Sequence, residues 1–298
     1  MTNRITPKLT FVLETPDRNT FDAAMGAVEG GKSAALLSEN KAAEFILKPC
    51  EANELQALRR GYQASLDALS IHADICVQNI ENQRKSLLIC DMDSTLIGQE
   101  CIDELADFAG VKDRVSAITE RAMRGEIGFE GALEERVGLL SGLDISVLQQ
   151  CFEQRIQLNA GARTLCQTMK AGGAKTAIVS GGFTFFTGRV AKACGFESHQ
   201  ANTLIEQDGK LIGKVGYPIL GREAKYDALM EHSGNAPLNA VAIGDGANDL
   251  AMIEAAGLGI AYYAKPAVAA AAHCAINYTD LTTALYFQGY KESEFVTT

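Results

Sequence analysis

The sequence predicts an α/β protein built around a parallel sheet, with a helical cap and a separate small domain before it. The parallel sheet is predicted from several short apolar runs, because such runs are typical of parallel strands buried on both faces. Some eighty residues with helical spacing separate the first two runs, far more than one crossover helix needs. A different order of elements precedes residue 80. The apolar runs lie at 87–90, 176–179, 241–243, 259–261 and 275–277.

Residues 81–298 are predicted to form one domain with a Rossmann-like sheet. The long segment after its first strand is predicted to be an inserted helical cap, at about 99–158. A β-hairpin is expected around Gln207-Asp208-Gly209, because apolar runs flank this turn sequence. The expected cap helices span 99–109, 111–124, 129–141 and 144–156, and the expected hairpin strands span 201–205 and 211–215.

Residues 1–80 predict a small α+β domain of the ferredoxin-like type. Strands and helices follow one another in the order β-α-β-β-α-β, which is typical of that fold. The order alone is similar to that of the small ACT-type regulatory domains, and no residue in it indicates a ligand. The expected strands span 8–14, 34–37, 45–48 and 75–77, and the expected helices span 17–28 and 51–69.

The segment from Gly26 to Ser33 matches the P-loop pattern G-x-x-x-x-G-K-S. That mechanism needs a strand before the loop and a helix after it, so that backbone amides face the phosphate. Here the preceding segment has a helical pattern and the following one is strand-like. We therefore predict a helix-to-strand turn and no nucleotide site.

Composition argues against nucleic acid and membranes as partners. The net charge is −10 and the pI is near 5, whereas both partners reward clustered Lys and Arg. Residues 1–8 lack the apolar core of a signal peptide, and no apolar run approaches the length of a membrane span. Eight cysteines without C-x-x-C spacing predict reduced, buried thiols. We expect a cytoplasmic protein that acts on a small molecule; its oligomeric state, a homodimer included, stays open.

Polar residues follow three of the predicted strands, at the point where each strand ends. In open α/β sheets, ligands bind at the carboxyl ends of the strands, so these clusters are expected to meet in one crevice. The three clusters are Asp91-Met92-Asp93-Ser94-Thr95, Ser180-Gly181-Gly182 and Gly244-Asp245-Gly246-Ala247-Asn248-Asp249.

Four carboxylates in these clusters predict a divalent cation. Asp91 and Asp93 are two residues apart, so their side chains point to the same side of an extended chain. Carboxylates aimed at one place repel each other unless a cation or proton intervenes, and Asp245 and Asp249 add to the charge. Mg²⁺ fits best, because it takes oxygen ligands and bridges to phosphate. The alternative is that one of these pairs forms only a turn or a helix cap.

The second cluster precedes a helix predicted around 183–194. The Ser180 hydroxyl, backbone amides and the helix N-terminus would form an anion site there. An ordinary N-cap is the alternative, and both can hold at once. Lys225 lies near the start of a helix predicted at 222–230, where a positive charge is unfavourable to the helix dipole. From its position alone, Lys225 is interpreted as a surface lysine.

Taken in order, these motifs resemble those of the haloacid dehalogenase-like hydrolase superfamily over residues 86 to about 285. The matching residues are Asp91-x-Asp93-x-Thr95, Ser180, Lys225 and Gly244-Asp245-Gly246-x-x-Asp249. Within the superfamily, the segments 90–110 and 129–140 resemble the phosphoserine phosphatase family, with Glu100 and Arg136 in the cap. The second aspartate argues against the dehalogenase branch, which lacks an acid at that position.

The resemblance implies hydrolysis of O-phosphoserine, the last step of serine biosynthesis, through an aspartyl phosphate. Asp91 would attack phosphorus, and Asp93 would protonate the leaving oxygen and then activate water. Mg²⁺ would bind to the Asp91 carboxylate, the Asp93 main-chain carbonyl and the Asp245 carboxylate, supported by Asp249. The expected phosphate-binding residues are Ser180, Gly181, Lys225 and Asn248.

Substrate choice is expected to depend on the cap. Helical spacing places Arg136 in an apolar stripe, where an unpaired guanidinium is costly and a substrate carboxylate would suit its fork geometry. Glu100 would hold the substrate ammonium. The residues alone leave an ion pair between Arg136 and Glu100, or another cap acid, as an equal alternative, and the resemblance favours substrate binding. Phe129 is expected in the core of the cap, with a lid over the site as the alternative.

Two rival functions stay open. One is a phosphatase or phosphotransferase of the same superfamily that acts on another small phosphomonoester. The other is a catalytically idle sensor whose N-terminal domain binds an amino acid; the intact Asp91 and Asp93 argue against it. Control by serine through residues 1–80 is a hypothesis that rests only on element order.

Overall fold

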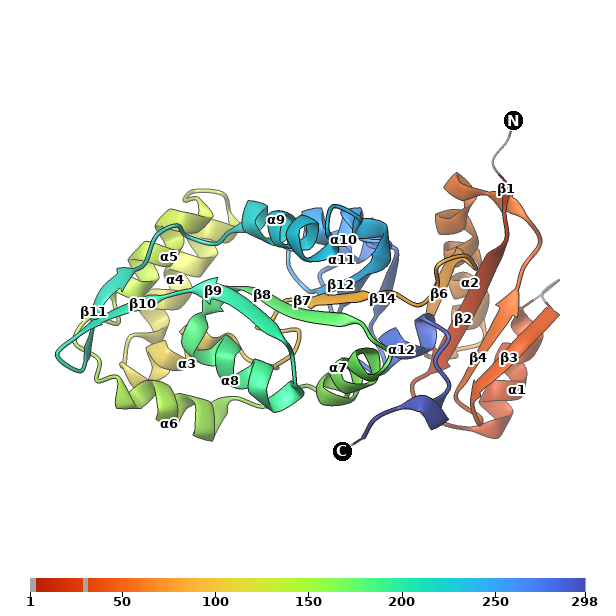
Figure 1. The fold of residues 1–298 in the computed structure, drawn as a ribbon, viewed down its shortest axis with the longest axis horizontal. Coiled ribbons are helices and arrows are strands. Elements are labelled where there is room, and N and C mark those ends of the chain that lie inside the picture. Colours follow the sequence, from red (N-terminus) through yellow and green to blue (C-terminus); the bar gives the residue numbers. More distant parts are fainter. Residues whose placement is uncertain (1–3, 29–31, 298) are drawn as a thin grey trace.

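The main sheet of the protein has six strands, and every neighbouring pair is parallel (Figure 1). A computed structural model describes residues 4–28 and 32–297. The strand order β14-β13-β12-β7-β8-β9 confirms the predicted parallel sheet. Its strands are β7 (Leu87–Cys90), β8 (Lys175–Phe183), β9 (Ser198–Asn202), β12 (Ala240–Gly244), β13 (Leu258–Tyr262) and β14 (Cys274–Ile276).

Helices cover both faces of this sheet, as its apolar strands require. Alternate residues of β7 enter different cores: Leu88 and Cys90 pack with α7 and α8, and Leu87 and Ile89 pack with α9 and α10. Figure 1 shows these helices on opposite sides of the strands. The covering helices are α7 (Ala162–Ala171), α8 (Thr184–Cys194), α9 (Arg222–Ser233), α10 (Leu250–Ala255), α11 (Pro266–Ala271) and α12 (Thr283–Phe287), with a 3-10 turn η2 (Pro237–Asn239) before β12.

The edge strand β9 was not predicted, and it corrects the predicted hairpin. Ala201 and Asn202 belong to β9 of the main sheet and not to the first hairpin strand. The observed hairpin pairs β10 (Leu204–Gln207) with β11 (Lys210–Val215) around the expected turn. The polar sequence Ser198-His199-Gln200 lacks the apolar run of a buried strand, and an edge strand does not need one.

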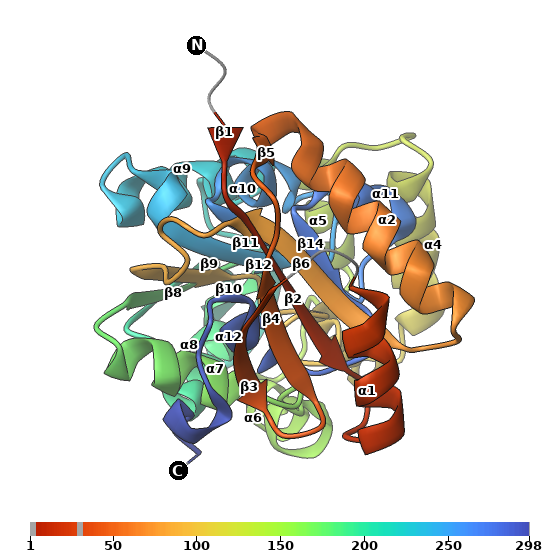
Figure 2. The ribbon, with the colours of Figure 1, turned by 90° about the vertical axis from the view of Figure 1, so that its right-hand side faces the viewer.

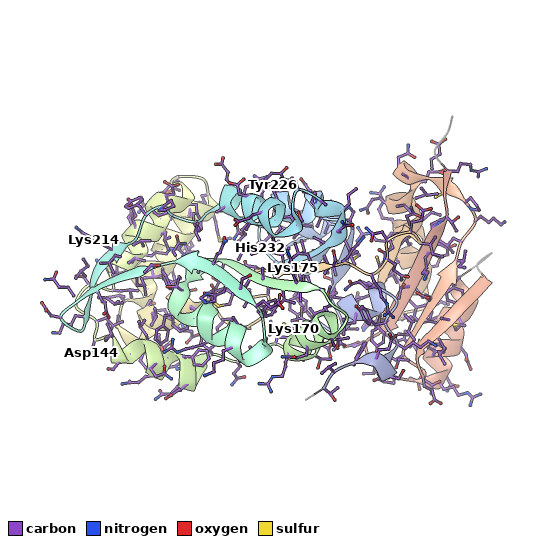
Figure 3. The ribbon with its side chains drawn as sticks, in the orientation of Figure 1. Asp144, Lys170, Lys175, Lys214, Tyr226 and His232 are labelled. Carbon is purple, nitrogen blue, oxygen red and sulfur yellow. The ribbon has the colours of Figure 1, made fainter. Side chains whose placement is uncertain are left out.

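Four helices follow β7 and form the predicted cap. The β10–β11 hairpin packs on this cap, since Asp144 pairs with Lys210 in an isolated bridge and Gly213, at φ +72°, lies against Gly138. Figure 3 labels Asp144 and Lys214 at this end of the molecule. The cap helices are α3 (Cys101–Phe108), α4 (Lys112–Met123), α5 (Phe129–Gly138) and α6 (Ser146–Arg155).

Elements before residue 80 form a separate antiparallel sheet with the strand order β3-β4-β2-β6. The helices α1 and α2 lie on one side of it, and α12 lies on the other (Figure 2). The order β-α-β-β-α-β is as expected; the domain limits 1–80 and 81–298 remain our proposal. The elements are β1 (Arg4–Ile5), β2 (Pro7–Leu13), α1 (Arg18–Ala27), β3 (Lys32–Ser38), β4 (Ala42–Ile46), β5 (Cys50–Glu51), η1 (Ala52–Glu54), α2 (Leu55–Ala68) and β6 (Ala73–Asn79).

The P-loop-like segment lies between a helix and a strand. α1 precedes it and β3 follows it, which is the reverse of the order that a P-loop needs. The turn itself, at residues 29–31, lies outside the described residues.

All eight cysteines are free, and seven of them are buried, as expected for reduced thiols. Among residues 4–28 and 32–297, no helix has the length and apolar character needed to cross a membrane.

Asp74 of β6 joins the two sheets. It is 2% exposed, and its carboxylate accepts hydrogen bonds from the backbone amides of Asn277, Tyr278 and Thr279 at 2.7–3.3 Å. The Thr279 hydroxyl adds a fourth donor at 2.6 Å. Beside it, His72 stacks on Tyr278 with ring centroids 4.9 Å apart. The loop that follows β14 is therefore held by the N-terminal sheet.

We expect Asp74→Ala to lower the free energy of unfolding by about 2–4 kcal/mol, because three backbone amides lose their buried acceptor. Urea denaturation followed by circular dichroism measures the change. Asp22→Ala on α1 is the matched control, since the Asp22 side chain is 69% exposed; its change should stay within about 0.5 kcal/mol. Equal losses in the two variants would contradict the anchoring role of Asp74.

Candidate active site

A small pocket of about 140 Å³ lies where the cap faces the carboxyl ends of β7, β8 and β12. Nearly all the residues predicted for the site meet there, although they come from segments up to 157 positions apart, from Asp91 to Asn248. The pocket is lined by Asp91, Asp93, Glu100, Ile102, Phe129, Leu133, Arg136, Ser180, Gly181, Gly182, Phe183, Asp245 and Asn248.

Asp91 and Asp93 follow the last residue of β7, and both side chains line the pocket. Met92 between them is fully buried. The carboxylate of Asp93 accepts from the amide of Cys101 at 3.0 Å, which ties it to the start of α3. Its second oxygen lies 3.5 Å from the Ser180 hydroxyl. Burial raises the pKa of Asp93, so its protonated form is accessible.

Lys225 is buried, which corrects its interpretation as a surface lysine. Its Nζ lies 2.7 Å from Asp91 Oδ2 and 2.5 Å from Asp249 Oδ1, and the side chain is 2% exposed. Asp249 also accepts from the amide of Gly246 at 3.0 Å. Lys225 lies near the start of α9. Burial alone would lower its pKa, but the negative charges of Asp249 and Asp91 outweigh this effect and raise the pKa of Lys225. Their attraction also offsets the unfavourable helix dipole.

Carboxylates in the pocket outnumber its cations. Oxygen atoms of Asp91, Asp245 and Asp249 lie within 4.8 Å of one another, and Lys225 supplies one positive charge between two of them. Burial first, and the charge of Asp249 next, raise the pKa of Asp245 to about 6. Burial raises the pKa of Asp91 well above its usual value. Oxygen donors with this excess of buried negative charge fit a divalent cation.

Ser180, Gly181 and Gly182 belong to the end of β8, so the strand extends beyond the run of 176–179 that the sequence predicted. The strand continues to Phe183, and α8 begins at Thr184. Ser180 Oγ accepts from the Gly182 amide at 2.9 Å. A Cβ on Gly182 would lie 2.4 Å from Asp93 Oδ2, so glycine allows the strand to approach the carboxylate.

Asn202 is a site-supporting residue that the sequence did not indicate. It is 1% exposed; its Nδ2 donates to Gly181 O at 2.9 Å, and its Oδ1 accepts from the Leu220 amide at 2.7 Å. It therefore holds the end of β8 at Gly181 beside the segment that leads into α9. A polar residue in the unpredicted strand β9 carried no signal of this role.

Arg136 lines the pocket with Glu100 but forms no ion pair with any of the residues that the structure describes. Its Nε donates to Ala132 O at 3.1 Å and its Nη1 to Thr119 Oγ1 at 3.4 Å. Among the described residues, no carboxylate lies within ion-pair distance of it, and Glu100 instead accepts from Ser94 Oγ at 2.7 Å. The alternative of an Arg136–Glu100 ion pair is therefore wrong.

Glu100 lies in an environment that disfavours its charge. Burial first, and the charge of Asp93 next, raise the pKa of Glu100 to about 7. Burial also lowers the pKa of Arg136, which Asp103 and Glu100 partly offset. A cation near Glu100 and an anion near Arg136 would relieve both groups.

Phe129 lies over the pocket, which corrects its expected place in the core of the cap. It is 37% exposed, and its ring lies so close to Gly181 that a Cβ there would be 3.1 Å from it. Leu133 and Leu140, on the same helical face, are buried as predicted. The helical spacing of apolar residues cannot distinguish a residue in the core of the cap from one at the exposed end of the same helical face.

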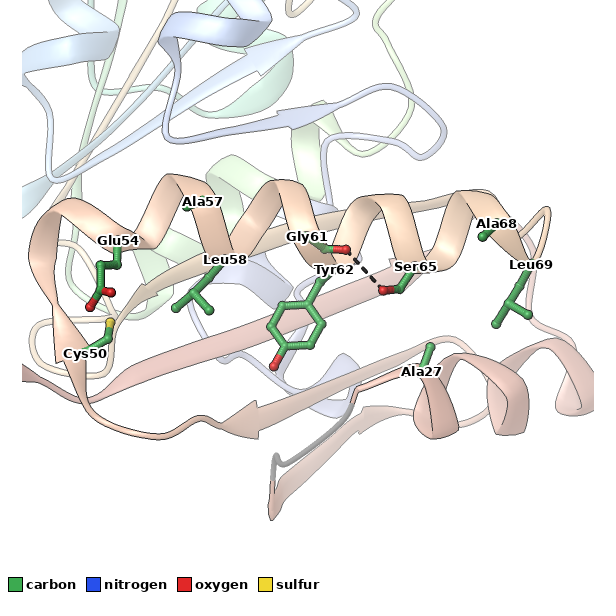
Figure 4. Close-up of a pocket in the computed structure, with 10 residues that line it drawn as sticks. All are labelled: Ala27, Cys50, Glu54, Ala57, Leu58, Gly61, Tyr62, Ser65, Ala68 and Leu69. Atoms are coloured by element: carbon green, nitrogen blue, oxygen red, sulfur yellow. Dashed lines mark hydrogen bonds between the residues drawn. The ribbon is translucent and has the colours of Figure 1, made fainter.

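A larger cavity, of about 850 Å³, lies along α2 on the N-terminal sheet (Figure 4). Its lining is mostly small or apolar, as with Ala57, Leu58 and Ala68, and it shares no residue with the pocket at Asp91. Size alone therefore does not identify the chemical site.

Comparison with known proteins agrees with this geometry. Residues 88–254 match the family described as haloacid dehalogenase-like hydrolase. A phosphoserine phosphatase of Streptomyces coelicolor is 42% identical over 81% of this chain and 59% of its own length. One of Saccharomyces cerevisiae is 41% identical over 74% of this chain and 72% of its own length.

A solved structure, the unliganded probable phosphoserine phosphatase of Vibrio cholerae, matches with a TM-score of 0.77 and 31% identity. The match covers 95% of this chain and 86% of that one. The chain spans less than two thirds of the Streptomyces relative. Both the match over residues 88–254 and these identities show that the chain belongs to the haloacid dehalogenase-like hydrolase family.

Proposed function

We propose that the protein hydrolyses O-phosphoserine to serine and phosphate, through an aspartyl phosphate on Asp91 and with Mg²⁺. One observation carries the proposal: two aspartates after β7 share a pocket with an arginine that forms no ion pair within residues 4–28 and 32–297. The 41% and 42% identity to phosphoserine phosphatases supports the same substrate. The reaction would complete the synthesis of serine.

In the first half of the reaction, Asp91 attacks phosphorus and the bond between phosphorus and the seryl oxygen breaks. Asp93 gives its proton to the departing oxygen; its raised pKa suits this acid role. In the second half, Asp93 takes a proton from water, whose oxygen attacks the phosphorus. Phosphate leaves, and the Asp91 carboxylate is restored.

Asp91, Asp245 and the main-chain carbonyl of Asp93 would hold Mg²⁺, which supplies positive charge for the phosphoryl oxygens when bound. Asp249 supports this site through its ion pair with Lys225. We assign contacts with the phosphoryl oxygens to Ser180, the Gly181 amide, Lys225 and Asn248. Phosphoryl transfer depends chiefly on such charge neutralisation and alignment.

Recognition of the amino-acid part is assigned to the cap. Arg136 would take the substrate carboxylate in its fork, and Glu100 would accept the ammonium. The substrate carboxylate would then stabilise the charged form of Arg136, and the substrate ammonium would stabilise the charged form of Glu100. Phe129 would close the pocket over the bound molecule.

We expect Arg136→Ala to lower kcat/KM for O-phosphoserine about 10–100-fold, because a charge-assisted bidentate contact is lost. Phosphoethanolamine has the ammonium but no carboxylate, so its kcat/KM should change less than about threefold. Phosphate release from the two substrates measures the split.

Arg121→Ala is the matched control, because Arg121 lies in the same cap and pairs with Glu135 at 2.8 Å outside the pocket. It should alter neither substrate. If Arg136→Ala lowered both substrates equally, Arg136 would not read the carboxylate, and another phosphomonoester would become the better candidate.

A further inference from the structure

Two arginines of α2 line a second polar cavity, at the junction of the two sheets. Arg59 and Arg60 border a space of about 360 Å³ between α2 and the segment that runs from α11 to the loop after β14. Residues of α2 and α11 line the same space, and Gln56 Nε2 donates to Ala272 O across the junction at 3.0 Å. A molecule in this space would therefore contact both parts of the chain.

Neither arginine has a partner among residues 4–28 and 32–297. No carboxylate there lies within ion-pair distance of Arg59 or Arg60, and neither guanidinium makes a hydrogen bond to these residues. Arg59 Nε is buried without an acceptor. Asp67, which also lines the cavity, instead accepts from Gln63 Nε2 at 3.0 Å. The cavity is thus locally basic in a chain whose net charge is −10.

The lining on the side of α11 and β14 is small and apolar, with Pro266, Ala269, Ala270 and Ala275, whereas Gln63, Asp67, Asn277 and Tyr278 add polar groups elsewhere in the cavity. Pockets of about 300–1,000 Å³ are typical of small-molecule sites. The volume exceeds what a bare oxyanion fills, so an apolar or neutral remainder has room against these residues.

We propose that this cavity is a second ligand site, which binds a small organic molecule through a phosphate group. Two guanidinium forks match the tetrahedral oxygens of phosphate, and two positive charges match its double negative charge. The buried Arg59 Nε gains its missing acceptor. The molecule's remainder lies against Pro266 and the alanines of α11.

The site adjoins the segment that the N-terminal sheet holds beside the catalytic pocket. Asn277 and Tyr278 line it, and Tyr278 also lines a neighbouring cavity of about 760 Å³ that contains Ser94 and Asp245. A ligand at the arginines would therefore contact the loop that Asp74 anchors.

NMR of the full chain with ¹⁵N-labelled arginine tests the proposal, because each Arg Nε–Hε signal reports its own site. The signals of Arg59, Arg60 and Arg136 are assigned by their loss in Arg59→Lys, Arg60→Gln and Arg136→Ala. Inorganic phosphate and n-butylphosphonate, which cannot be hydrolysed, are titrated at constant ionic strength. The Arg136 signal separates binding in the catalytic pocket from binding at α2.

We expect saturable shifts of Arg59 and Arg60 with both probes, and tighter binding of butylphosphonate, whose tail covers the apolar lining. Arg60→Gln and Arg59→Lys should each weaken binding at least about tenfold, while Arg18→Gln, an exposed arginine on α1, should not. Shifts that never saturate, that match those of Arg18, or that persist in Arg60→Gln would overturn the proposal. Equal affinity for both probes would overturn the apolar part of it.

Discussion

Asp91→Asn should lower phosphate release from O-phosphoserine by at least about 10⁴-fold, because an amide cannot take the phosphoryl group as a carboxylate does. The asparagine keeps the shape of the side chain, and its Oδ1 can still accept from the Met92 amide, a bond of 2.7 Å in the native chain. The fold should therefore survive. Steady-state kinetics measures the loss, and calorimetric titration with phosphoserine shows whether binding persists.

Asp113→Asn, an exposed acid at the start of α4, is the matched control and should keep its activity. A retained affinity for phosphoserine in Asp91→Asn would place the loss in the chemical step. Activity above about 1% of the native value, once mass spectrometry has ruled out deamidation back to aspartate, would mean that Asp91 is not the nucleophile.

Lys225→Met should reduce the free energy of unfolding by about 3–5 kcal/mol, because two buried carboxylates lose the cation between them. The methionine fills most of the lysine's volume, so the change removes charge rather than packing. Activity should fall as well, since Asp91 is then more strongly held in its protonated form. Urea denaturation and kinetics at pH 7 give both values.

Lys192→Met, at an exposed position in the last turn of α8, controls for the loss of a positive charge and should change stability by less than about 0.5 kcal/mol. Added Mg²⁺ should restore part of the stability of Lys225→Met, because a divalent ion replaces the missing positive charge. A variant as stable as the native protein without the ion would contradict the charge balance drawn for the pocket.

The sequence predicted the parallel sheet because buried strands must be apolar along their whole length. It did not predict β9, since an edge strand tolerates Ser, His and Gln, and these polar residues carry no periodic signal. The hairpin turn was found from Asp208-Gly209, and only the limits of its strands were wrong. The turn could thus be predicted from local sequence, whereas the edge strand β9 forms through its pairing with β8, which local sequence does not show.

The sequence predicted which polar clusters lie together, but it did not predict which of the side chains are buried. The three polar clusters met in one pocket because strand ends converge in this topology. The burial of Lys225 could not be read from its helix, since the compensating acids lie 134 positions before it and 24 after it. Asn202 and the exposed edge of Phe129 likewise depend on contacts that only the folded chain creates.

Phosphate release from O-phosphoserine, measured first with EDTA, then with excess Mg²⁺, and compared with phosphoethanolamine, tests the central claim most directly. We expect turnover of phosphoserine that EDTA abolishes and Mg²⁺ restores, and a clear preference over the analogue without a carboxylate. Phosphate release at the same rate with and without EDTA, or at equal rates from the two phosphate esters, would contradict the function proposed for this pocket.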